Sequence, residues 1–195
     1  MNLVERAKSI MFKPNETWEV VKREEITIKE LFISYAAILA IIPAVAGFIG
    51  MSLIGSSVLG MHFRIPVMSG IFHAILSYVL SLVAVYVVAF IIDALAPTFG
   101  SRKDMVSAVK VAVFSFTPAW VAGIFMIIPM LSILGLLGSL YGLYLLYAGL
   151  PVLMETPKEK AAGYFVIVIV VSIIVSVIVN IVARMAIPAG GMMMP

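Results

Sequence analysis

Five long apolar stretches dominate the sequence and determine the solvent in which the chain can fold. They lie at about Leu31–Gly55, Ile71–Ala96, Met105–Ile128, Leu131–Met154 and Ala161–Ile187. Each is long enough to cross about 30 Å of hydrocarbon as a helix of roughly 20 residues, and lipid cannot satisfy the backbone of an open structure. With 63% hydrophobic and 12% charged residues, the chain has too few polar groups to cover a water-soluble globule. The sequence predicts an all-α membrane protein, a bundle of five transmembrane helices.

Lysine and arginine are concentrated on one side of these stretches. Ten of the thirteen lie in residues 1–30, between the second and third stretches or between the fourth and fifth, and Lys110 lies near the same end of the third stretch. Only Arg64 and Arg184 lie on the other side. Cytoplasmic loops carry the excess of Lys and Arg in membrane proteins. The pattern therefore predicts a cytoplasmic N-terminus and, with five spans, a C-terminus outside. Residues 188–195 are expected to form a disordered extracytoplasmic tail after the domain of residues 31–187.

Residues 1–30 read as a cytoplasmic amphipathic segment. Apolar residues recur at helical spacing in it, and Pro14 divides it into two short helices. Trp18 and Val21 share the apolar side of the second helix. One interpretation places the helices on the inner membrane surface, with Trp18 as an anchor at the depth of the headgroups. The other packs the same apolar side against the cytoplasmic ends of the spans.

Polar residues within the spans are the candidates for a functional site. A charge at the bilayer centre costs about 2.5–3.5 kcal/mol on insertion scales. Asp93 and Lys110 lie near the inner ends of the second and third spans, on either side of a short turn. At similar depth they could pair, either as a gate or ion-coupled site or as a structural ion pair. Alternatively, each snorkels separately to the inner surface.

The fifth span carries a polar stripe. Ser172, Ser176, Asn180 and Arg184 are spaced four residues apart, which places them on one helix face. The stripe could line a polar path together with Asp93, Lys110 and Thr117, or it could pack against a neighbouring helix. In the fourth span, Gly135, Gly138 and Gly142 are predicted to allow close helix contact, within the bundle or in a dimer.

Several classes of function find no support in the sequence. There is no cysteine, which excludes disulfides, Cys-ligated zinc and thiol catalysis. No phosphate loop, hydrolytic triad or pair of carboxylates within a span is present, so neither an enzyme nor a cofactor is predicted. His62, His73 and the methionines near the outer face lack ligand spacing, so no metal site is predicted. The basic residues are spread along a membrane face, which argues against nucleic-acid binding.

Three stretches resemble a known family. The stretch from Tyr141 to Tyr164 carries the main resemblance, and its most specific part runs from Leu150 to Tyr164, beginning Leu-Pro-Val-Leu-Met-Glu-Thr-Pro. Pro14 followed by Glu-Thr-Trp at 16–18, and Phe-Ser-Phe-Thr-Pro at 114–118, are also similar. Together they resemble the prokaryotic branch of the Yip domain family. The resemblance implies five transmembrane helices with a cytoplasmic N-terminus, in a prokaryotic cell (inner) membrane.

Eukaryotic members of that family are associated with Rab-type GTPases and vesicle traffic. They carry an Asp-Leu-Tyr-Gly-Pro motif before the first span, and this sequence lacks it, which argues against a GTPase partner. The resemblance and the residues together predict a membrane-organising or partner-binding protein without enzymatic activity, whose partners are membrane lipids and further copies of the chain. The alternative is a small transporter or channel that uses polar residues of spans two, three and five. Convergence of those residues on one cavity would favour the alternative.

Overall fold

The structure is a computed structural model that describes residues 2–58 and 61–185. In this part of the chain, five helices are long and apolar enough to cross a membrane. They span Ile28–Ile54, Val67–Phe99, Met105–Ile127, Pro129–Leu153 and Lys158–Val182. The prediction of an all-α membrane protein with five spanning helices is confirmed. The predicted tail at 188–195 lies outside the described residues.

The spanning helices are built from several regular segments. The first span joins two short π-helical segments to α-helices, and 3-10 turns end the second and third spans and begin the fourth. The α-helices are α1 (Leu3–Phe12), α2 (Pro14–Arg23), α3 (Ile28–Leu31), α4 (Ala37–Phe48), α5 (Val67–Leu95), α6 (Met105–Ala122), α7 (Ile133–Leu153) and α8 (Lys158–Met185). The π-helical segments are Phe32–Ala36 and Ile49–Ile54, and the 3-10 turns are Ala96–Phe99, Gly123–Ile127 and Pro129–Leu131. Two short strands, β1 (Ser56–Val58) and β2 (Met61–Phe63), pair antiparallel between the first two spans.

The two N-terminal helices form where the sequence predicts them. Asn2 caps α1 in a reciprocal capping box with Glu5, which satisfies two backbone N–H groups that the first turn leaves free. Pro14 occupies the first position of α2, where its missing N–H costs nothing. The division of this segment at Pro14 is therefore confirmed.

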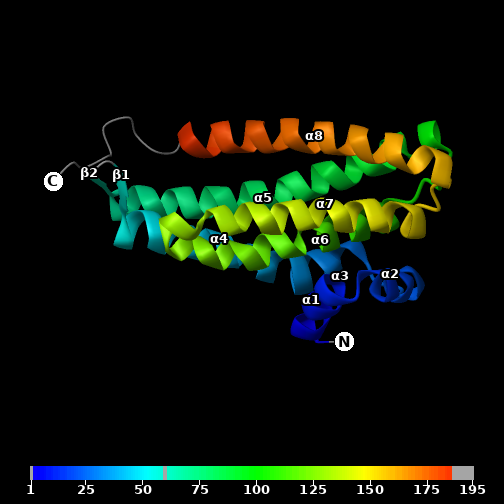
Figure 1. The fold of residues 1–195 in the computed structure, drawn as a ribbon, viewed down its shortest axis with the longest axis horizontal. Coiled ribbons are helices and arrows are strands. Elements are labelled where there is room, and N and C mark those ends of the chain that lie inside the picture. Colours follow the sequence, from blue (N-terminus) through cyan, green and yellow to red (C-terminus); the bar gives the residue numbers. More distant parts are fainter. Residues whose placement is uncertain (1, 59–60, 186–195) are drawn as a thin grey trace.

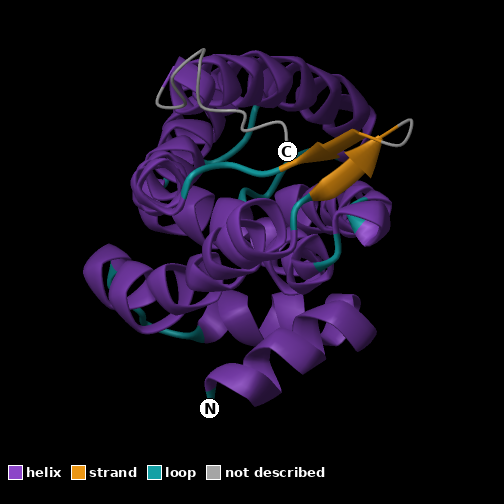
Figure 2. Cartoon of the chain, turned by 90° about the vertical axis from the view of Figure 1, so that its left-hand side faces the viewer, coloured by secondary structure: helices purple, strands orange, loops and turns teal. Residues whose placement is uncertain are grey.

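The spans are arranged around α6. In the most apolar stretch of this span more than half of the residues are buried, whereas only 6% of the residues are buried in the corresponding stretch of the span that contains α8. Helices α4, α5 and α7 pack around α6, and α8 packs mainly along α5. Figures 1 and 2 show α8 as an outer layer on one side of the bundle, with α1 and α2 on the opposite side. The N-terminal segment therefore covers a face of the bundle that α8 leaves open.

Two loops meet at the end of the bundle that carries α2. Gly100 adopts a left-handed conformation (φ 65°) that ends the turn after α5, a conformation that glycine adopts without strain. The next residue, Ser101, donates from its hydroxyl to Thr156 at 2.9 Å, and the Arg102 N–H donates to the Met154 carbonyl at 2.8 Å. We call this end, with residues 2–30, 96–104 and 154–160, the basic end of the bundle. The strands β1 and β2 lie at the opposite end (Figure 1).

The glycines of α7 make a contact within the bundle. A Cβ on Gly138 would lie 2.6 Å from the Pro118 carbonyl oxygen and from the Ala122 side chain, and one on Gly142 would lie 2.5 Å from the Ser115 carbonyl oxygen. Gly135, one turn earlier, has open space at the same position. Gly138 and Gly142 therefore allow close contact with α6 within the bundle, which is one of the two predicted roles of these glycines.

This contact leads to a matched pair of substitutions. Gly138→Val is expected to lower the free energy of unfolding by about 1–3 kcal/mol, because α6 and α7 must separate to admit the side chain. Gly135→Val introduces the same side chain into open space and is expected to change stability little. Unfolding of both variants in mixed micelles would compare them. Equal losses would show that β-branching in α7, and not the contact with α6, determines the effect.

Candidate functional site

Asp93 and Lys110 do not form a pair in the structure. Both are buried, with 9% and 4% of their surface exposed. The Lys110 ammonium donates instead to the backbone carbonyls of Val21 (2.9 Å) and Glu24 (2.6 Å), at the C-terminal end of α2. One carboxylate oxygen of Asp93 is buried without a hydrogen-bond partner among the described residues. Lys110 is therefore neither paired with Asp93 nor extended separately to the membrane surface. It lies at the end of α2, where the last carbonyls of the helix lack partners within it and attract a cation.

The polar residues of the other spans also bond locally. Thr117 is fully buried, and its hydroxyl lies 2.9 Å from the Tyr35 hydroxyl, so this pair links the first and third spans. On α8, the Ser172 hydroxyl donates to the Val168 carbonyl at 2.7 Å, and the Asn180 amide donates to the Ser176 carbonyl at 2.8 Å. The Arg184 side chain lies outside the described part of the structure.

Ser172 and Ser176 line a groove between α5, α6, α7 and α8. We call it the lateral groove; its volume is about 380 Å³, and its other hydroxyls come from Ser115 and Ser139 in an otherwise apolar lining. Asp93, Lys110, Thr117 and Asn180 do not line it. Of the six residues of the candidate polar path, the structure therefore brings only Ser172 and Ser176 together in this groove.

Trp18 is a packing residue. Its side chain is fully buried. Its ring lies against Gly149 of α7, where an added Cβ would be 2.8 Å from the nearest ring atom, and it meets the Phe114 ring edge-on at a centroid distance of 6.1 Å. The prediction of a headgroup-depth anchor is wrong, and the alternative, packing against the ends of the spans, describes the structure. Gly149, which has no side chain, provides the space on α7 for the large ring of Trp18.

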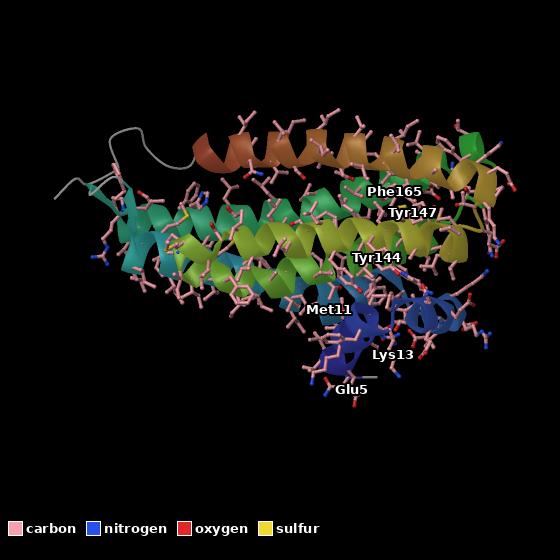
Figure 3. The ribbon with its side chains drawn as sticks, in the orientation of Figure 1. Glu5, Met11, Lys13, Tyr144, Tyr147 and Phe165 are labelled. Atoms are coloured by element: carbon pink, nitrogen blue, oxygen red, sulfur yellow. The ribbon has the colours of Figure 1, made fainter. Side chains whose placement is uncertain are left out.

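Two further contacts attach α1 to the bundle. Arg6 is only 6% exposed, and its guanidinium pairs with the Glu24 carboxylate and lies 5.8 Å from the centre of the Phe114 ring. The Tyr141 hydroxyl donates to the Met11 carbonyl at 2.6 Å. Figure 3 shows Met11 on the side of α1 near the bundle and Glu5 on the side away from it. Arg6 gives no signal of this role in the sequence, because a lone arginine in a charged segment has the pattern of a solvated residue.

A second cavity lies at the basic end, where α1 and the start of the first span meet. We call it the interfacial pocket; its volume is about 350 Å³. Its polar lining consists of Arg6, Glu24, Glu25, Glu30, Ser34 and Tyr35, and Leu3, Ile26, Leu31 and Phe114 supply its apolar walls. Three carboxylates and one guanidinium therefore face the same space, at the level where the chain enters its first span.

The described residues contain no group of three His, Asp or Glu side chains that could hold a metal ion. His73 lies 3.4 Å from the Ser77 hydroxyl, one turn away on α5. The side chains of Met61 and His62 fall outside the described part of the structure. The prediction of no metal site and no cofactor therefore remains a prediction.

Comparison with known proteins identifies the family. The Yip1 domain matches residues 8–179. Inner membrane protein YohC of Escherichia coli K12 is 25% identical over 155 residues, which cover 77% of this chain and 80% of YohC, and YohC of Escherichia coli O6:H1 matches equally. No solved structure matches the chain. Together with the five spanning helices and the domain match over most of its length, these findings show that the chain belongs to the Yip1 domain family of integral membrane proteins.

Proposed function

We propose that this protein acts without catalysis, as a membrane-organising protein that binds lipids and membrane partners. The observation that carries the proposal is the distribution of its polar groups and cavities. Lys110, Thr117 and Ser172 bond to neighbouring backbone or side chains, while the lateral groove lies between four spanning helices and the interfacial pocket lies at the start of the first span. Among the described residues, this arrangement supports surfaces for lipid and protein rather than a polar path through the spans.

The proposal includes an orientation, with residues 1–30 in the cytoplasm of a prokaryotic cell and the end of α8 outside. The eleven cationic residues counted in the sequence fall in the N-terminal segment, in the loops of the basic end or near them. The positive-inside rule supports placing that end in the cytoplasm. The relative YohC is an inner membrane protein, which supports the same membrane.

Native mass spectrometry of the detergent-solubilised protein tests the function. We expect oligomers of the chain, bound lipid, or both, because the exposed apolar side chains of α8 and the two cavities need occupants. A strictly monomeric, lipid-free particle would contradict the proposal. Solute flux into proteoliposomes that is lost in Asp93→Ala would contradict it as well, since that result requires a polar path.

A further inference from the structure

Two side chains that line the interfacial pocket each have an unpaired polar atom in the described structure, one a hydrogen-bond donor and the other an acceptor. Nη1 of Arg6 and Oε2 of Glu24 are buried and have no hydrogen-bond partner among the residues that the structure describes, although the same two side chains pair through their other atoms. A buried charged group without its full set of hydrogen bonds is costly. Both residues line the pocket. An occupant that accepts a bond from Arg6 and donates one to Glu24 would satisfy both.

The net charge of the pocket also favours a cationic group. Glu24, Glu25 and Glu30 contribute three carboxylates against the single guanidinium of Arg6. An anion alone would meet the repulsion of these carboxylates, and a simple cation would leave Nη1 of Arg6 unused. A zwitterion, with a phosphate and an ammonium group a few bonds apart, matches the free donor and the excess of acceptors together.

The location of the pocket indicates a membrane lipid. Glu30 lies in the first turn of the first span, and Leu31, Ser34 and Tyr35 follow it along the same span. On the neighbouring helix α1, Val4 and Phe12 leave 53% and 78% of their surfaces exposed, as residues that meet lipid do. A lipid with its acyl chains along the first span would present its headgroup at this level. A soluble zwitterion would gain nothing from the apolar surroundings.

We propose that the interfacial pocket binds the phosphoethanolamine headgroup of a membrane phospholipid. The phosphate accepts from Arg6, and the ammonium donates to the carboxylates of Glu24, Glu25 and Glu30. The primary ammonium has three N–H donors, and bonds between charged groups are the strong ones. A choline headgroup has the same charges without an N–H, so it cannot form the second set of bonds. This inference rests on the proposed function and specifies the lipid.

The double variant Glu25→Gln/Glu30→Gln tests the proposal in the full-length protein. Both side chains are exposed, so the fold should tolerate the change. The protein is reconstituted in nanodiscs of equal parts phosphatidylethanolamine and phosphatidylcholine with identical chains, and retained lipids are measured by native mass spectrometry. We expect about tenfold enrichment of phosphatidylethanolamine on the wild type, the ratio that corresponds to one charge-assisted bond. The double variant should show little or no preference.

The control removes the same charge from the same end of the bundle. Glu19→Gln/Glu159→Gln alters two exposed carboxylates outside the pocket and should keep the wild-type enrichment. Equal retention of the two lipids by the wild type, or equal loss of preference in both double variants, would overturn the proposal. Displacement of the lipid by soluble phosphoethanolamine at millimolar concentration would also overturn it, because the ligand would then be the soluble compound.

The same measurement separates this inference from the proposed function. Lipid that is retained without headgroup preference contradicts the inference and leaves the proposed function standing. A wild type that is monomeric and free of lipid contradicts the proposed function itself.

Discussion

Trp18→Ala is expected to lower the free energy of unfolding by about 3–5 kcal/mol, the usual loss for a fully buried aromatic residue. The ring fills the space between Gly149 and Phe114, and its removal leaves a cavity that neighbouring side chains cannot close. The loss should fall mainly on the attachment of α2 to α7. Unfolding in mixed micelles measures the total, and limited proteolysis shows whether residues 2–23 become accessible first.

Phe12→Ala provides the comparison within the same segment. Phe12 leaves 78% of its surface exposed, so its truncation removes few contacts with the protein, and we expect a change within about 0.5 kcal/mol. Gly149→Leu approaches the same interface from the other side, since its side chain would occupy the space of the Trp18 ring. If Trp18→Ala proved as mild as Phe12→Ala, the buried position of Trp18 would be wrong.

Lys110→Met is expected to weaken the same attachment by about 2–3 kcal/mol. The substitution keeps the length and the apolar stem of the side chain but removes the two bonds to the carbonyls of Val21 and Glu24. Bonds to charged groups contribute about 1.5–3 kcal/mol, and the two carbonyls would have to find other partners. The end of α2 should therefore loosen while the five spans stay folded.

Trypsin provides the measurement, because Lys22 and Arg23 lie beside these carbonyls and are exposed. Cleavage there should be faster in Lys110→Met than in the wild type. Lys103→Met removes an exposed lysine from the loop before α6 and should leave the cleavage rate at these two sites unchanged. Equal cleavage rates in the wild type and in Lys110→Met would show that Lys110 does not hold α2.

The spans could be predicted from sequence because lipid imposes a simple condition. Any chain segment in hydrocarbon must satisfy its own backbone, so length and apolar composition suffice to recognise a helix there. The break between α1 and α2 at Pro14 and the position of charged residues at the ends of the spans follow from equally local rules. The predicted spans therefore agree closely with the observed helices, including the short connection near Pro129.

The role of Trp18 could not be predicted because its signal is ambiguous. An amphipathic helix has the same pattern whether its apolar face meets lipid or the flank of a bundle. Only the opposing surface decides between the two, and here that surface is Gly149, 131 positions later in the chain. A glycine near one end of a span was the available signal, but its partner could not be identified without the fold.

The pairing considered for Asp93 and Lys110 failed for a related reason. Their similar depth follows from the short turn between the second and third spans and stays a prediction. The competing partner of Lys110, the carbonyl groups at the end of α2, consists of backbone atoms and leaves no trace in side-chain patterns. Backbone acceptors at helix ends therefore deserve weight whenever a lone lysine lies near a membrane surface.

The attachment of the N-terminal segment has a consequence for biosynthesis. Residues 2–23 leave the ribosome before any span, yet Lys110, Tyr141 and Gly149, which hold them, belong to the third and fourth spans. During translation, α1 and α2 cannot complete their docking until the fourth span has entered the bilayer. Their docking is thus a late step of assembly. In a nascent chain arrested before residue 141, Trp18, which the folded protein buries, would be accessible to chaperones and proteases.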